Sequence, residues 1–98
     1  MTRVLSYAIA SLVLIVATQA LAANGQQVYD QNCAVCHNNL DPKIGDKAAW
    51  APRIKLGTDA LVASVIKGKG AMAPRAGKPS LSDDDIKAAV EYIESKVK

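Results

Sequence analysis

Apolar residues recur at helical spacing in three stretches of the chain. In residues 25–36 they share one face and follow Asn24, a residue type that often caps a helix. In residues 58–67 they form a second stripe, which ends at Gly68. The third stretch follows Ser82 and opens with aspartates, whose charge suits the first turn of a helix. This pattern predicts three helices.

The segments between these stretches lack helical periodicity. Residues 38–56 contain two prolines and a glycine, and residues 68–80 are also rich in glycine and proline, so both are predicted to be loops. The sequence contains neither an alternating strand pattern nor an internal repeat. We therefore predict an all-α fold with three main helices and long loops. Loops of this length in a small domain usually serve a function or are held by another group.

The N-terminal region has a different character. A basic start, residues 1–3, precedes the apolar residues 4–16, and small residues follow around Ala22. This order is typical of a secretory signal peptide. We predict a signal peptide over residues 1–22, cleaved after Ala22 or Ala23, with export by the Sec pathway to the periplasm and a domain over 23–98. Because a membrane-spanning helix needs roughly 20 apolar residues, an uncleaved anchor is the alternative.

The predicted domain is small and has few large apolar side chains. The whole chain contains no Phe and only one Trp. In a domain of about 75 residues, apolar burial alone gives marginal stability, and a staple or cofactor is usually needed. A buried apolar cofactor would supply the missing core volume.

The two cysteines of the chain are three residues apart, in the sequence C-A-V-C-H from Cys33 to His37. C-x-x-C-H is the attachment motif of c-type haem. Helix positions i and i+3 face the same way, so both thiols can form thioethers with one porphyrin edge. The motif predicts one covalent haem on Cys33 and Cys36, with His37 as an iron ligand.

A cysteine pair at this spacing has three other possible roles. A thioredoxin-like redox pair needs a βαβ context, which the helical pattern does not provide. A zinc site needs about four ligands, and the domain offers two Cys and one His. A structural disulfide remains the plainest alternative, although so short a loop would remove little entropy from the unfolded chain.

The second iron ligand follows by elimination. Outside the predicted signal peptide, Met72 is the only Met and His37 is the only His. Met72 lies in a glycine- and proline-bearing loop, and Met/His ligation is the cytochrome c pattern, in which the potential is raised. Two protein ligands leave no open position on the iron, which favours outer-sphere electron transfer. A haem enzyme or gas sensor is the rival interpretation.

Four blocks of sequence carry a family resemblance. They are C-A-V-C-H, P-K-I-G-D-K-A-A-W-A-P-R-I from Pro42 to Ile54, G-A-M-A-P-R-A-G from Gly70 to Gly77, and L-S-D-D-D-I-K-A-A-V-E-Y-I from Leu81 to Ile93. In this order they make the chain resemble class I cytochromes c, most closely the small bacterial cytochrome c5 group. The resemblance covers residues 25–97.

The resemblance implies a cytochrome c fold around one haem and a single-electron carrier of a respiratory chain. A dedicated electron-accepting haem subunit of a periplasmic dehydrogenase is the alternative within the same class of proteins. The resemblance also implies that the first and last helices cross at Gly25, Tyr29 and Tyr92, where glycine permits close approach.

The resemblance further implies cofactor-binding roles outside the haem-attachment motif. The Pro42 carbonyl would accept the second ring N–H of His37 and orient that ligand. Trp50 and Arg53 would pack near the haem propionates and donate hydrogen bonds to them. For Trp50, simple packing of a loop on the core is the alternative.

The charge distribution suggests the class of partner. The chain holds 12 basic and 9 acidic residues, so its net charge of +3 is modest and nucleic-acid binding is not expected. Basic residues concentrate in residues 41–78. A positive patch near Met72 would steer an acidic redox protein, whereas a solvated lysine-rich surface is the alternative. The residues that flank Met72 in this way are Lys67, Lys69, Arg75 and Lys78.

Overall fold

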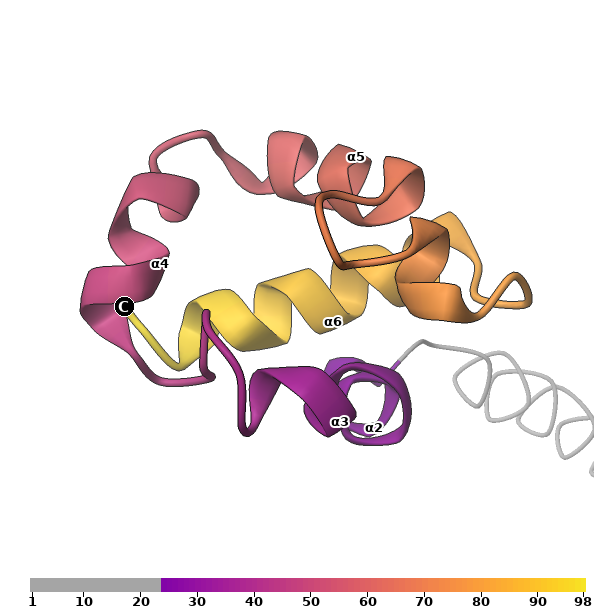
Figure 1. Cartoon of the computed structure of the whole chain (residues 1–98), viewed down its shortest axis with the longest axis horizontal. Helices are drawn as coiled ribbons and strands as arrows, with labels where there is room; N and C mark the ends of the chain where they lie inside the picture. The colour runs from indigo at the N-terminus through magenta and orange to yellow at the C-terminus, as the bar shows by residue number, and fades with distance from the viewer. Residues whose placement is uncertain (1–23) are drawn as a thin grey trace, which may run out of the picture.

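The computed structural model describes residues 24–98, which form a helical domain (Figure 1). The predicted signal peptide and its cleavage site lie outside this range. Within residues 24–98, no helix combines the length and the apolar character that a membrane crossing requires.

The first predicted helix is present as three consecutive segments. These are α2 (Gly25–Val28), the π-helical turn η2 (Tyr29–Cys33) and α3 (Ala34–His37). The carboxamide oxygen of Asn24 accepts a hydrogen bond from the Gln27 amide at 3.1 Å, which confirms the expected cap. In η2 the Ala34 amide donates to the Tyr29 carbonyl, five residues back. Single π-turns of this kind are frequent at functional sites, and this one ends at Cys33, the first residue of the C-A-V-C-H motif.

The prediction of an unbroken loop over residues 38–56 is wrong. This segment contains the helix α4 (Lys47–Ile54). The Asp46 carboxylate caps it by accepting from the Ala49 amide at 3.1 Å, and Trp50 anchors it in the core with 7% of its surface exposed. Pro52 made the segment look unsuited to a helix, but it lies close to the C-terminal end and removes only one backbone hydrogen bond.

The other two predicted helices are confirmed as α5 (Thr58–Lys67) and α6 (Asp83–Ser95). The predicted N-cap of α6 forms a reciprocal pair. The Ser82 hydroxyl accepts from the Asp85 amide at 3.0 Å, and the Asp85 carboxylate accepts from the Ser82 amide at 3.2 Å. The segment between these helices is irregular, as expected, except for the short 3₁₀ turn η3 (Pro74–Gly77).

Helix α6 is the centre of the domain, with α2 packed against it on one side and α5 on another (Figure 1). The crossing with α2 depends on Gly25, because a Cβ atom there would collide with the Ala88 carbonyl of α6. Beside this contact the rings of Tyr29 and Tyr92 lie 5.4 Å apart between centroids. The helix crossing that the resemblance implied is confirmed.

The buried apolar side chains form two clusters, and α6 contributes to both. The first cluster consists of Tyr29, Trp50, Ala89 and Ile93. The second consists of Leu61, Ile86 and Val90. Within residues 24–98 the core is therefore divided between the α2 side and the α5 side of the same helix.

We expect Gly25→Ala to destabilise the domain, because the added methyl group forces α2 away from α6. Overpacking of this kind costs about 1–3 kcal/mol. Guanidinium unfolding of the purified protein measures the loss, and Gln26→Ala, an exposed change on the same helix, is the matched control. Equal stability of the two variants would show that the crossing is not tightly packed.

Candidate functional site

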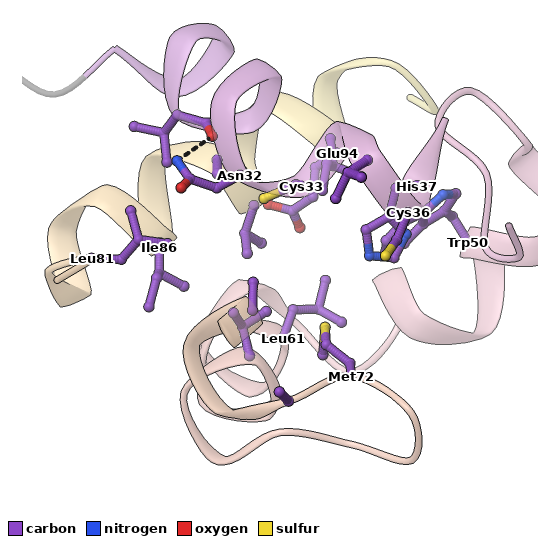
Figure 2. Close-up of a pocket in the computed structure, with 18 of the residues that line it drawn as sticks. Asn32, Cys33, Cys36, His37, Trp50, Leu61, Met72, Leu81, Ile86 and Glu94 are labelled. Atoms are coloured by element: carbon purple, nitrogen blue, oxygen red, sulfur yellow. Dashed lines mark hydrogen bonds between the residues drawn. The ribbon is translucent and has the colours of Figure 1, made fainter. Parts of the chain in front are cut away.

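A cavity of about 260 Å³ lies between the two core clusters and is lined mainly by apolar side chains (Figure 2). Its walls include five of the seven residues predicted for the cofactor site: Cys33, Cys36, His37, Trp50 and Met72. Pro42 contributes through a contact with His37, whereas Arg53 is not part of the wall. In Figure 2, Cys33, Cys36 and His37 lie on one side of the pocket, and Met72 and Leu61 lie on the other.

Both cysteines on the cavity wall are free thiols. Cys33 is half-buried, and burial raises the pKa of its thiol, with a smaller contribution from Cys36. Cys36 is exposed. The structural disulfide is therefore not formed in this part of the chain. A zinc site also lacks support, because residues 24–98 contain no cluster of three His, Cys, Asp or Glu side chains.

The His37 ring is oriented by the loop that follows it. Its Nδ1 atom lies 2.8 Å from the Pro42 carbonyl oxygen, which can only accept, so Nδ1 carries the proton and donates. The Nε2 lone pair is then free for a metal. The Ile44 amide donates to the His37 carbonyl at 2.7 Å, which ties the same loop back to the end of α3. The four residues between His37 and Pro42 are enough to close this loop.

Trp50 closes the site from α4. Its ring centroid lies 5.7 Å from that of His37, and its indole N–H donates to the Lys43 carbonyl at 2.8 Å. The only N–H group of the indole therefore already has a partner. Arg53, one turn further along α4, donates to the Ala49 carbonyl of the same helix.

A hydrogen bond that the sequence did not reveal spans the haem-attachment motif. The hydroxyl group of Tyr29 donates to the Asn38 side-chain oxygen at 2.7 Å. Tyr29 is only 2% exposed, and burial raises the pKa of its hydroxyl to about 12. This bond fixes the end of α3 to the first core cluster. Asn38 could have been recognised only through the fold, because no local pattern links the two residues.

Met72 is positioned by a tight turn at the end of α5. Lys69 and Met72 exchange two backbone hydrogen bonds of 2.9 Å, and Gly70 between them has φ +58°, as the first central residue of a type II′ turn requires. A Cβ atom on Gly68 would lie 2.8 Å from the Pro74 nitrogen and 2.9 Å from the Met72 carbonyl oxygen. Gly68 therefore lets this segment lie directly on the helix end. The Met72 sulfur points into the pocket (Figure 2).

Arg75, which follows Met72 in the chain, stabilises this segment through contacts with the start of α6. Arg75 and Ala76 both have φ +54°, a left-handed conformation that is costly for residues other than glycine. The Arg75 guanidinium donates to the Leu81 carbonyl at 2.9 Å and forms an ion pair of 2.8 Å with Asp83. These contacts hold the strained turn against the start of α6. Arg75, one of the four basic residues predicted to dock a partner protein, is thus already paired within the chain.

Comparison with known proteins agrees with this geometry. The family model described as cytochrome c oxidase, cbb3-type, subunit III matches residues 20–93. Cytochrome c-555 of Chlorobaculum tepidum is 42% identical, and the match covers 95% of this chain and 95% of that protein. Cytochrome c5 of Azotobacter vinelandii is 39% identical over 70% of this chain and 89% of its own length. The chain belongs to the class I cytochromes c. The resemblance found in the sequence is confirmed.

A solved structure extends the agreement to the fold of this cytochrome. A cytochrome c chain in the crystal structure of an electron transfer complex of nitrite reductase with cytochrome c superimposes with a TM-score of 0.73. The match has 44% identity and covers 76% of this chain and 94% of that one. The predicted all-α cytochrome c fold is confirmed.

Family membership means that the cytochrome carries a covalent c-type haem and exchanges electrons with redox proteins. The residues present fit this cofactor. Two free thiols, an imidazole with an available Nε2 and a thioether face one apolar cavity. The two thiols are placed to form the thioethers of a c-type haem, and imidazole and thioether are borderline or soft ligands, which suit haem iron and not a hard cation.

We expect Gly68→Ala to destabilise the cytochrome more than Gly57→Ala does. These glycines flank α5 with nearly the same backbone, φ 84° and ψ 156° against φ 93° and ψ 157°, so the strain of adding a side chain is matched. Only Gly68 is blocked by neighbouring atoms. The extra cost should be about 1–3 kcal/mol in guanidinium unfolding. Equal losses would mean that the Met72 segment does not press on the helix end.

Proposed function

We propose that this cytochrome is an exported, periplasmic single-electron carrier of a respiratory chain, with His37 and Met72 as the two ligands of the haem iron. The observation that carries the proposal is the presence of both side chains on the walls of the cavity that also holds the chain's two thiols. Export is supported by the signal-like pattern of residues 1–22.

The chain's own residues suit this role. The Pro42 carbonyl keeps the proton on Nδ1 of His37, so that Nε2 offers its lone pair to iron. Met72 supplies a soft thioether, which favours the reduced metal and raises the potential. When bound, the haem provides reversible one-electron oxidation and reduction of its iron. If His37 and Met72 both bound the iron, they would leave no free position for substrate or oxygen, which supports a carrier over an enzyme.

The apolar walls add a second property of a carrier. Leu61, Ile86 and Val90 come from helices that are packed on one another, and they give the cavity wall an apolar surface. Such a site undergoes little rearrangement when its charge changes, because there are few mobile dipoles to reorient. The walls therefore support rapid exchange of single electrons.

Met72→Leu tests the ligation directly. The substitution keeps the apolar volume and removes the sulfur, so we expect loss of the weak near-infrared sulfur-to-iron band and new binding of imidazole by the oxidised protein. The reduction potential should fall by about 59 mV or more, a tenfold change for a one-electron couple. Val65→Ala, which alters the same cavity wall without touching the sulfur, should keep the band. A band that persists in Met72→Leu would contradict the proposal.

The partner surface is proposed to consist of Lys67, Lys69 and Lys78, which are exposed around the Met72 segment. Arg75 is left out because its guanidinium is paired with Asp83. An acidic redox protein is the matching partner, since complementary charge accelerates encounter. The similar crystal structure, an electron transfer complex of nitrite reductase with cytochrome c, supports docking onto a redox protein.

Charge reversal at Lys69 tests this surface without knowledge of the natural partner. We expect Lys69→Glu to slow oxidation of the reduced cytochrome by ferricyanide, an anionic one-electron oxidant, by about tenfold at low salt. The difference should largely vanish near 1 M salt, where the Debye length is about 3 Å. Lys87→Glu, an exposed change on α6 outside the cavity wall, is the control. Equal slowing by both variants would rule out a local docking surface.

A further inference from the structure

Glu94 is the one buried charged side chain among residues 24–98, with 4% of its surface exposed. It lies in the last turn of α6 and forms part of the cavity wall. Figure 2 shows it on the side of the pocket that carries Cys33 and His37. Burial of a carboxylate is costly unless another group compensates its charge. Its position beside the cofactor cavity therefore needs an explanation.

The hydrogen bonds of Glu94 compensate the cost of burying its carboxylate only in part. The Thr58 hydroxyl is shared between the two carboxylate oxygens, at 3.0 and 3.1 Å. The ion pair found in the described part of the chain joins other residues, Arg75 and Asp83. Thr58 is the first residue of α5, whose positive end favours the carboxylate, but Glu94 also lies at the negative end of its own helix. These two helix-end effects oppose each other.

A purely structural role does not require this charge. If Glu94 served only to accept the Thr58 hydroxyl, a glutamine would do so at lower cost, because it carries no charge to desolvate. What a glutamine would lack is the ability to stabilise positive charge inside the cavity. A carboxylate at this position would stabilise a group in the cavity whose positive charge changes by one unit during function.

We propose that the Glu94 carboxylate lowers the reduction potential of the cytochrome by stabilising the oxidised form of the cofactor. The inference rests on the proposed carrier function, and it deepens that function by naming a residue that sets the potential. It also opposes the effect of Met72, which raises the potential. Together the two side chains would place the cytochrome at an intermediate potential.

The step that Glu94 influences is a simple one. One electron passes from a donor redox protein to the iron, and no covalent bond forms or breaks. Positive charge in the cavity falls by one unit, so Glu94 loses a favourable electrostatic interaction on reduction. Because the carboxylate is buried, dissolved salt screens this interaction much less than it screens surface charges.

The test compares neutral variants of Glu94 with the wild-type haem-loaded protein in a spectroscopic redox titration. At a fixed ambient potential, Glu94→Gln should raise the ratio of reduced to oxidised protein roughly tenfold, which equals about 59 mV for a one-electron couple. Glu94→Leu should give the same shift, since it also removes the charge. Glu91→Gln removes an equal charge from an exposed position on the same helix and should change the ratio little.

Two further readouts separate charge from structure. The shift should persist near 1 M salt, and the sulfur-to-iron band should remain in every Glu94 variant. An unchanged ratio would overturn the proposal, and so would loss of the sulfur-to-iron band. The proposal also fails if the ratios of the Gln and Leu variants differ from each other as much as they differ from that of the wild type. If the Gln variant does not mature, the Leu variant decides alone. Absence of the band from the wild type would instead refute the proposed ligation by Met72.

Discussion

The fold depends on one constraint, the division of its core by an apolar cavity. Helix α6 faces α2 with Ala89 and Ile93 and faces α5 with Ile86 and Val90, so neither half forms a complete core. A domain of this size buries little apolar surface through its side chains alone, and the covalent haem supplies the missing apolar volume. The cofactor is therefore part of the packing as well as the source of the chemistry.

Small local devices around the cavity position the ligands. Close approach at Gly25 and Gly68 brings α2 onto α6 and the Met72 segment onto α5. Strain is concentrated at Arg75 and Ala76, and the contacts of Arg75 with the start of α6 offset it. On the opposite wall the His37 ring is held by a carbonyl of its own loop. Each proposed ligand is thus fixed by neighbours that do not depend on the other one.

Much of this arrangement could be predicted from the sequence, because periodicity and caps are local. Helices α5 and α6 follow from their apolar stripes, and the thiols and His37 follow from their spacing. Helix α4 was missed because it is short and contains Pro52. The π-turn was missed because no residue pattern distinguishes it from an α-helix. Contacts such as Thr58 with Glu94 join residues 36 positions apart, and only the folded chain brings them together.

The crossing of α2 and α6 has a consequence for how such a chain can vary. It joins the first and the last helix of the described domain, so the chain between them, which carries both His37 and Met72, forms one closed loop. The entropy of closing a ring rises only slowly with its length, by about 0.6 kcal/mol for each doubling. Residues can therefore be inserted or lost in this loop with little effect on the crossing. The loops around the cofactor cavity can therefore change in length and sequence while the packing of α2 on α6 is retained.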